Sequence, residues 1–400
     1  MQLSFNDALS GCYGKDLPKN AEPLAGMDYA EELALKCKAF EMFCRANMPK
    51  EVKPAAPVAA VQPRKYRANS KRKAEFHRGK FRLLNMDSTL AGTSALEPDS
   101  HKELYDLITK TFAEKNYHIL AGHVNFCIVR GAGAYQALVL NIDRFDGKVI
   151  HAAKNFANVL KKESPKTGAF FLYLDETDSK YYLESKRPEG RMGIKKMFGP
   201  ENLSVKLDNL KLMYPPVVFS QVNEAMLPMF ARIAREMLGP EKEDILLDLY
   251  CGYGLLGLSM ADAVKSVIGV EIDGPAVKAA SANASFLFKQ KNMRFVKGEI
   301  SPALLRNKLP ARDFDRNELI VLDPPRMGTA GGVIRELAKR EPERVLHIVC
   351  GTDEIPREVE EWKKYGYQLK RIRPVDMFPG TAGLETFLLF EPRPDKFTKE

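Results

Sequence analysis

The sequence predicts an α/β fold with a doubly wound, Rossmann-like sheet in its second half, preceded by an antiparallel β-rich (α+β) domain. After Pro216, short apolar strands alternate with helical stretches: ILLDLY, LLGLSMADAV, VIGVEI, AVKAASANASFLF, LIVLDPP, VIRELAKR, VLHIVC and REVEEWKKYG. Such alternation is typical of a parallel sheet with helices on both faces. Between about His118 and Tyr182, strand-like stretches recur instead, separated by glycine-rich or charged turns: VNFCIVR, YQALVLNI, AFFLYLDE and KYYLES.

The N-terminal region predicts one helix and a linker. Apolar residues from about Tyr29 to Ala46 recur at three- and four-residue spacing, as in an amphipathic helix. The following stretch, MPKEVKPAAPVAAVQPR, is rich in proline and alanine, which favours an unpacked linker. We therefore expect three parts: residues 1–62, helix and linker; 63–215, the β-rich domain; and 216–400, the Rossmann-like domain.

Composition and charge restrict the class of partner. The 400 residues carry a formal net charge of +9, which favours a polyanion such as RNA, DNA or a membrane surface. The 6 cysteines are scattered without a CxxC pair, so no disulfide framework or metal site is indicated. No signal peptide and no long apolar run is apparent. We expect a monomer in the cytoplasm without membrane association, and a mitochondrial location remains an alternative.

Basic and aromatic residues are interleaved between Arg64 and Arg82. The stretch contains nine Lys and Arg residues against one acid, Glu75, together with Tyr66, Phe76 and Phe81. Guanidinium groups and aromatic rings together bind phosphates and stack on unpaired bases. RNA contact is one interpretation of this stretch, and a solvated basic face is the other.

A glycine-rich turn follows the first strand of the Rossmann-like half. Gly252, Gly254 and Gly257 lie where ILLDLY leads into a helix, so a ligand can approach backbone amides there. Asp248 precedes the turn and is suited to bind a cationic amino group, although it could also cap a helix. Glu271 ends the next strand, where an acid accepts hydrogen bonds from ribose hydroxyls or simply faces solvent. The combination indicates a nucleoside cofactor.

The stretch LIVLDPPRMG indicates which cofactor is bound. Asp323 and two prolines form a stiff turn after a strand, at the edge where open α/β sheets bind ligands. In nucleic-acid methyltransferases such a turn faces the target base. Together with LDLYCGYG and GVEID, it predicts an enzyme that uses S-adenosylmethionine.

Two further residues predict methylation at carbon. Amino-group methyltransferases place an aromatic residue after this prolyl turn, whereas Arg326 stands here. Carbon 5 of a pyrimidine requires a thiolate that adds to carbon 6 and a base that removes the hydrogen from carbon 5. Cys350, at the end of VLHIVC, and Glu385, before the last apolar strand, provide these groups. Taken singly, each also fits a core thiol or an ordinary turn acid.

From about Tyr66 to Phe390 the chain resembles the RNA uridine-5-methyltransferase family, in particular its tRNA T-arm branch. The resemblance rests on the motifs FSQVNEAM, LDLYCGYG, GVEID, LDPPRMG, the strand-ending Cys350 and DMFPGTAGLE. It implies a class I methyltransferase fold, S-adenosylmethionine as cofactor and a tRNA substrate. By the same resemblance, Cys350 is the nucleophile and Glu385 is the base.

The resemblance also implies roles for residues that bind the ligands. Gln221 resembles a cofactor contact, Tyr250 and Glu271 resemble contacts to the cofactor's nucleoside, and Asp323 resembles the acid that lines both the cofactor and base pockets. The segment KYRANSKRKAEF resembles the family's basic segment. Its predicted RNA contacts are Tyr66, Arg67, Arg72 and Lys73.

The chain departs from the family pattern next to both reacting groups. The family usually has Asn after the nucleophile and His two residues before the base, where this chain has Gly351 and Gly383. An altered rate or target, or a noncatalytic RNA-binding relative acting in RNA folding or ribosome assembly, would be consistent with these changes. No four-cysteine cluster or N-terminal β-barrel is apparent, which favours tRNA over rRNA as the substrate. An RNA cytosine-5-methyltransferase would usually carry a cysteine in the prolyl turn, where Arg326 stands.

Overall fold

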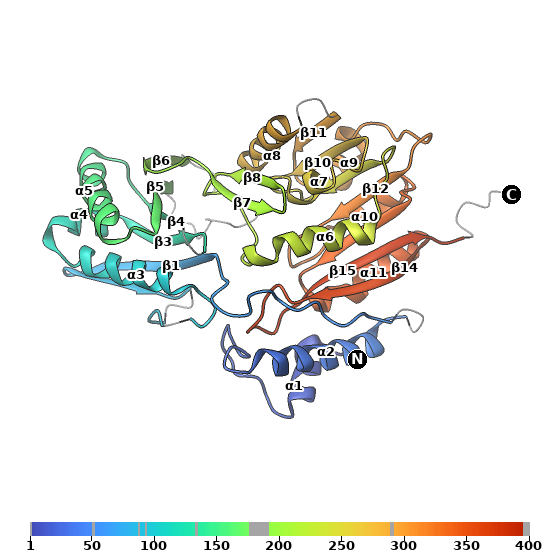
Figure 1. Ribbon diagram of the computed structural model, residues 1–400, viewed down its shortest axis with the longest axis horizontal. Coiled ribbons are helices and arrows are strands. Elements are labelled where there is room, and N and C mark those ends of the chain that lie inside the picture. Colours follow the sequence, from blue (N-terminus) through green and yellow to red (C-terminus); the bar gives the residue numbers. More distant parts are fainter. Residues whose placement is uncertain are drawn as a thin grey trace. The chain divides into compact units, whose positions relative to one another are not determined.

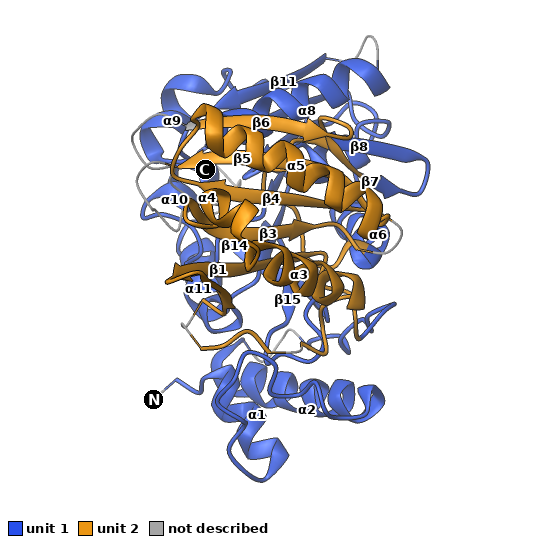
Figure 2. Cartoon of the chain, turned by 90° about the vertical axis from the view of Figure 1, so that its left-hand side faces the viewer, with its two compact units in different colours: residues 1–63, 205–213, 225–400 blue, residues 64–204, 214–224 orange. Residues whose placement is uncertain are grey.

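The computed structural model describes residues 2–49, 53–86, 89–92, 94–132, 135–175, 192–288 and 292–394. These residues form two compact units (Figure 2). Unit 1 comprises residues 1–63, 205–213 and 225–400, and unit 2 comprises residues 64–204 and 214–224. The expected strand KYYLES, at residues 180–185, lies outside the described residues.

Unit 1 contains a 7-stranded sheet in the order β11-β10-β9-β12-β13-β15-β14 (Figure 1). Its strands are β9 Ile245–Leu249, β10 Ser266–Glu271, β11 Asn292–Lys297, β12 Glu318–Leu322, β13 Arg344–Val349, β14 Tyr367–Val375 and β15 Glu385–Pro392. The first five are parallel, whereas β15 is antiparallel to both β13 and β14. The predicted doubly wound sheet is therefore confirmed, with an antiparallel pair at one edge.

Helices lie on both faces of this sheet. They are α6 Leu227–Leu238, α7 Leu255–Ser259, α8 Gly274–Leu287, α9 Pro302–Lys308, α10 Val333–Ala338 and α11 Ile355–Lys364, with 3₁₀ turns η2 Glu224–Met226 and η3 Thr352–Glu354. Leu388 packs in the core that contains α10 and α11. Its neighbour Phe387 meets Phe230 of α6 at a ring-centroid distance of 4.9 Å. Because successive strand side chains point to opposite faces, α6 covers the other face.

The N-terminal segment belongs to the core of unit 1. Helix α1 spans Phe5–Tyr13, and α2 spans Tyr29–Asn47, which confirms the predicted amphipathic helix. Asp28 caps α2 by accepting hydrogen bonds from the first turn. Buried Phe5, Phe40 and Phe43 join the same apolar cluster as the sheet.

The described part of the expected linker also packs. The Ala55 amide donates to the Ile372 carbonyl at 3.1 Å, and the Val58 amide donates to the Pro374 carbonyl at 2.9 Å. The segment therefore runs beside β14, although its composition suggested an unpacked tether. Its prolines are compatible with such an edge position, because an edge segment leaves some amides unpaired.

Unit 2 contains a 6-stranded sheet in the order β2-β1-β3-β4-β5-β6. Its strands are β1 Asn69–His77, β2 Lys80–Leu84, β3 Val124–Arg130, β4 Gln136–Ile142, β5 Thr167–Asp175 and β6 Met192–Phe198. Its helices are α3 Asp99–Phe112, η1 Lys115–Tyr117, α4 His118–Ala121 and α5 Gly147–Glu163. A two-stranded hairpin, β7 Leu203–Leu207 and β8 Leu210–Tyr214, follows in the chain, and its residues 205–213 belong to unit 1.

The expected antiparallel sheet of unit 2 contains one parallel pair. Strands β4 and β5 run in the same direction because α5 connects them as a crossover helix. The other neighbours in this sheet are antiparallel. The β-rich prediction is confirmed, and its purely antiparallel form is corrected by this crossover. Throughout the described residues, no helix has both the length and the apolar character needed to cross a membrane.

Candidate active site

The residues expected to bind the cofactor and carry the chemistry meet at one edge of the unit 1 sheet. Tyr250 follows β9, Glu271 ends β10, Asp323 follows β12 and Cys350 follows β13. Glu385 begins β15, and an antiparallel strand starts at the edge where its parallel neighbours end. The sheet topology therefore places these five residues of unit 1 along the ligand-binding edge of an open α/β sheet.

The turn from β9 into α7 uses left-handed backbone conformations. Tyr250, Gly252 and Gly254 all have positive φ values, of 65°, 54° and 90°. A Cβ atom on Gly252 would meet no atom within 4 Å, so the turn is open at this point. A Cβ atom on Gly254 would lie 2.8 Å from Leu258 Cδ1, so glycine is needed there for packing as well as for conformation.

Glu271 supports this turn through its carboxylate. The Gly252 amide donates to Glu271 Oε2 at 3.1 Å, and the Asp273 amide donates to Oε1 at 2.8 Å. Burial raises the pKa of Glu271, against the lowering effect of these amides. Each oxygen retains a second lone pair for a ligand hydroxyl. The side chain thus both supports the turn and offers acceptors to a ribose.

Asp248 is buried beneath the same turn, with 1% of its surface exposed. Its Oδ2 accepts a hydrogen bond from the Gly257 amide at 2.8 Å, so it also satisfies an amide of α7. Burial, together with the negative charge of Glu271, raises its pKa to about 7. Asp248 therefore bonds an α7 amide as a helix cap would, and this contact is compatible with its predicted role in binding a cationic group.

Asp323 is the acid between the cofactor turn and the reacting groups. Its amide donates to the Leu249 carbonyl at 3.3 Å, which ties the prolyl turn to β9. Burial of its carboxyl group and the negative charges of Asp248 and Glu271 raise its pKa to about 7. The three acids therefore interact electrostatically.

Cys350 and Glu385 lie at the other end of this acidic cluster. Burial, followed by the charges of Glu385 and Asp323, raises the pKa of the Cys350 thiol to about 12, against a lowering by Arg326. Burial and the charge of Asp323 raise the pKa of Glu385 well above its ordinary value, again against Arg326. Glu385 is 1% exposed, and its Oε1 is buried without a hydrogen-bond partner.

Two other residues shape this edge without having been singled out as site residues in the sequence. Arg326 follows the prolyl turn and is the cation that offsets the charges around Cys350 and Glu385. Asn283 of α8 donates from Nδ2 to the Tyr253 carbonyl at 3.2 Å and to the Met213 carbonyl at 2.9 Å. Arg326 was visible beside the LDPP motif, whereas no local signal marks Asn283.

Gln221 lies in unit 2, in the segment 214–224. This segment is held by Arg130, a buried arginine of β3. Arg130 Nη1 donates to the Pro216 carbonyl at 2.7 Å, and its Nη2 donates to the Val218 carbonyl at 2.9 Å and to Ser220 Oγ at 2.7 Å. These bonds fix the backbone directly before Gln221, whose cofactor contact remains a prediction.

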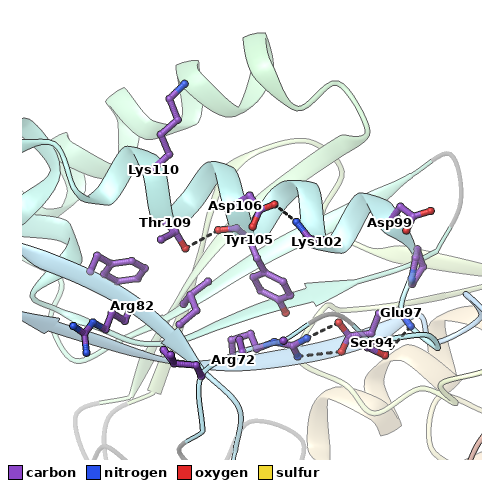
Figure 3. Close-up of a pocket in the computed structure, with 16 residues that line it drawn as sticks. Arg72, Arg82, Ser94, Glu97, Asp99, Lys102, Tyr105, Asp106, Thr109 and Lys110 are labelled. Carbon is purple, nitrogen blue, oxygen red and sulfur yellow. Dashed lines mark hydrogen bonds and ion pairs between the residues drawn. The ribbon is translucent and has the colours of Figure 1, made fainter. Parts of the chain in front are cut away.

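The four predicted RNA contacts differ in exposure. Tyr66 is 2% exposed and Arg72 is 7% exposed, whereas Arg67 and Lys73 are half-buried. Figure 3 shows Arg72 directed at Glu97, and its Nη1 and Nη2 donate to the two carboxylate oxygens at 3.0 and 2.6 Å. The guanidinium also lies 4.9 Å from the centre of the Tyr105 ring. Arg72 and Tyr66 are therefore engaged inside unit 2.

The Arg72–Glu97 pair lines a pocket of about 590 Å³ beside β2 and α3 (Figure 3). Phe81 and Leu83 contribute apolar surface, while Arg82 and Lys110 add positive charge. The outward-facing cations of β1, β2 and their turn include Arg78, Lys80 and Arg82, which are exposed. These three cations belong to the basic stretch between Arg64 and Arg82 but are not among its four predicted RNA contacts.

Comparisons with known proteins agree with this geometry in both the fold and the family. The fold is that of a class I methyltransferase: the crystal structure of Pyrococcus abyssi tRNA (uracil-54, C5)-methyltransferase in complex with S-adenosyl-L-homocysteine matches with a TM-score of 0.69. That match has 15% sequence identity and covers 94% of this chain and 87% of the other. The model of the tRNA (Uracil-5-)-methyltransferase family matches residues 182–393, more than half of the chain. The chain belongs to this family.

Sequence relatives include methyltransferases described for different RNAs. An uncharacterized RNA methyltransferase of Caldanaerobacter subterraneus is 27% identical over 288 residues, covering 70% of this chain and 59% of the relative. The 23S rRNA (uracil(1939)-C(5))-methyltransferase of Klebsiella pneumoniae is 35% identical over 186 residues, covering 46% and 42%. The chain thus spans about half the length of the curated relatives it matches.

Proposed function

We propose that this protein methylates carbon 5 of a uridine in RNA, with S-adenosylmethionine as the methyl donor. The observation that carries the proposal is that Cys350, directly after β13, and Glu385, at the start of the neighbouring β15, lie at the same sheet edge as the acid-lined glycine turn. Family membership supports the same reaction. The presence of both reacting groups favours an enzyme over a noncatalytic RNA-binding relative.

The residues at the sheet edge fit this cofactor. S-adenosylmethionine carries a sulfonium and an ammonium group, and Asp248 and Asp323 are acids whose pKa values are raised by burial and by neighbouring negative charges, which a cationic ligand would offset. Glu271 offers acceptors for ribose hydroxyls beside the open Gly252 turn. When bound, the cofactor supplies an electrophilic methyl group.

The chemistry of the chain itself begins at Cys350. Carbon 5 of uracil is a weak nucleophile, and addition of the Cys350 thiolate to carbon 6 moves the electron pair of the 5,6 double bond toward carbon 5. The thiol must lose its proton before it attacks. Its raised pKa in the unligated protein means that neutralising the nearby acids favours this ionisation.

Glu385 completes the reaction as the base. Once carbon 5 carries the methyl group, its hydrogen must leave as a proton so that the ring regains the double bond and expels the Cys350 sulfur. The unpartnered Oε1 of Glu385 is available to accept this proton. The raised pKa of Glu385 makes its carboxylate a stronger base, while Arg326 favours the ionised form.

We place tRNA first among the RNA substrates. The description of the matching family supports tRNA, whereas several relatives are 23S rRNA enzymes, so rRNA is the second candidate. A target uridine in a folded RNA must leave its stack to reach the half-buried Cys350, which costs about a few kcal/mol. Exposed cations in the β1–β2 turn and on β2 would offset part of this by binding phosphates.

The proposal is tested by incubating the protein with S-adenosylmethionine and either unmodified tRNA or a 23S rRNA fragment. Nuclease digestion and mass spectrometry of the nucleosides then report the product. We expect 5-methyluridine from one of the two RNAs and none without the cofactor. Cofactor binding by calorimetry without 5-methyluridine from either RNA would contradict the proposal and support a noncatalytic role.

A further inference from the structure

Three buried charged side chains and a half-buried tyrosine join α2 to the segment that leads into Glu385. Lys36 Nζ lies 2.9 Å from Glu32 Oε1 and 2.9 Å from Asp376 Oδ1, and all three side chains are fully buried. Tyr29 donates from its hydroxyl to Asp376 Oδ2 at 3.2 Å. We call Tyr29, Glu32, Lys36 and Asp376 the Lys36 cluster.

The Lys36 cluster also holds the backbone of residues 376–380. Lys36 Nζ donates to the Phe378 carbonyl at 3.3 Å, and the Gly380 amide donates to Glu32 Oε1 at 2.6 Å. The Leu24 amide donates to the Gly380 carbonyl at 3.0 Å. Gly380 has a φ of 84°, and Gly383 follows before the base, so this segment has more conformational freedom than an ordinary chain. Contacts from α2 remove that freedom.

Helix α1 contacts the segment that follows Cys350. The Phe5 amide, at the start of α1, donates to Asp353 Oδ1 at 2.7 Å, three residues after Cys350. Asn47 at the end of α2 joins this arrangement: its Nδ2 donates to the Leu3 carbonyl at 2.8 Å, and its Oδ1 accepts from the Leu3 amide at 3.2 Å. The two N-terminal helices therefore contact the segments that carry both reacting groups.

Burial of these charges is poorly explained by stability alone. Removing a lysine and two carboxylates from water carries a desolvation penalty that their attraction only partly offsets, and apolar replacements of buried ion pairs are often equally stable. Phe5, Phe40 and Phe43 already attach the helices to the core by apolar contact. The polar cluster adds a defined position for 376–380. The matched family region begins at residue 182, so neither helix lies within it.

We propose that Lys36, Glu32 and Tyr29 of α2 are positioning residues for the reaction, which hold 376–385 so that Glu385 faces the target carbon. This role rests on the proposed function. Glu385 begins β15 directly after the held segment, and a shift of about 1 Å at a reacting group can lower a rate by about 100-fold. Loss of the Lys36 cluster should therefore slow turnover while cofactor binding stays unchanged.

The test compares full-length Lys36→Met with Lys36→Arg and with Phe43→Leu as a matched control on the same helix. Phe43 is fully buried in the apolar core and is not a member of the Lys36 cluster. We expect Lys36→Met to lower kcat about 10- to 100-fold with KM for the cofactor unchanged. Lys36→Arg should restore most of kcat. Phe43→Leu should lower the melting temperature while kcat stays near wild type.

Hydrogen–deuterium exchange of residues 376–384 gives a readout that needs no methylation. We expect faster exchange of this segment in Lys36→Met, and a smaller increase in the milder Tyr29→Phe, which remains informative if Lys36→Met does not fold. In Phe43→Leu, residues 376–384 should remain protected from exchange. Unchanged exchange in both cluster variants, with kcat no lower than in Phe43→Leu, would overturn the proposal. Absence of methylation in wild type would refute only the proposed function, since the exchange comparison still tests the positioning role.

Discussion

Cys350 and Glu385 are the next residues beyond the last registered pair of β13 and β15, in which Val349 lies opposite Thr386. The antiparallel pairing therefore brings together two residues that are far apart in the sequence. Asp323, beyond the adjoining strand β12, is the acid whose charge acts on both. The proposed nucleophile, the proposed base and an acid thus share one sheet edge.

Replacing Glu385 with Gln should separate bond formation from proton removal. The amide cannot accept the carbon 5 proton, so we expect turnover to fall at least about 100-fold while Cys350 still adds to carbon 6. The covalent protein–RNA complex should then accumulate and run as a slower band in denaturing gels. Its absence from the Cys350→Ala, Glu385→Gln double variant is the control. An active Glu385→Gln enzyme would show that another group is the base.

Replacing Arg326 with Met should make the Cys350 thiol harder to ionise. The pKa of Cys350 is already about 12 because of burial and the nearby acids, and Arg326 is the group that lowers it. Removing this cation should shift the pH profile of Cys350 alkylation further upward, so that alkylation at a fixed pH becomes slower. Mass spectrometry of the peptide containing Cys350 measures the rate. A profile unchanged from wild type would show that Arg326 does not act on the thiol.

Asp248→Asn should stabilise the protein against unfolding at high pH when no cofactor is added. It should also weaken cofactor binding. The folded pKa of Asp248 is about 7, above its value of 3.8 in an unfolded chain, so its ionisation opposes folding. The destabilisation is absent below about pH 4, grows between about pH 4 and 7, and is complete above that range. The three-unit difference corresponds to about 2–4 kcal/mol in favour of Asn at pH 8. Denaturant unfolding at pH 4 and pH 8 checks this, and equal stability gains at both would contradict the assignment.

Arg82 and Arg72 should respond differently to replacement by alanine. Arg82 is exposed on β2, so Arg82→Ala should weaken RNA binding and reduce the salt dependence by about one unit of slope, with little change in stability. Arg72→Ala leaves the Glu97 side chain, which is only 12% exposed, without its cation and should destabilise the protein by about 3 kcal/mol. Binding titrations at several salt concentrations, together with thermal unfolding, separate the two effects. Equal losses of affinity in folded variants would contradict this distinction.

The sequence predicted the elements whose signals are local. Strands β9, β12 and β13 are short runs of buried apolar residues, and each leads into a turn that carries a chemical group, so both the strands and their site residues could be identified. In contrast, β11 mixes half-buried and exposed residues and was not predicted. Helix α5 was also missed, although its buried Val149, Ala153 and Phe156 follow helical spacing, because it lies between two stronger strand patterns.

Long-range contacts could not be predicted from the sequence. Lys36 and Asp376 are 340 positions apart, and nothing in either local pattern indicates that the lysine is buried against the segment before Glu385. Arg72 looked like a surface cation because its neighbours are basic, yet its partner Glu97 lies 25 residues away. Sequence patterns predict which face of an element is apolar, and they do not reveal which charges pair within the interior.

The measurement that tests the central claim most directly is release of tritium from RNA labelled at carbon 5 of uridine. The account predicts release from wild type that requires S-adenosylmethionine, is retained by Cys37→Ala, and disappears in Cys350→Ala because no thiolate can add to carbon 6. Tritium release by a folded Cys350→Ala protein at the wild-type rate would contradict the account.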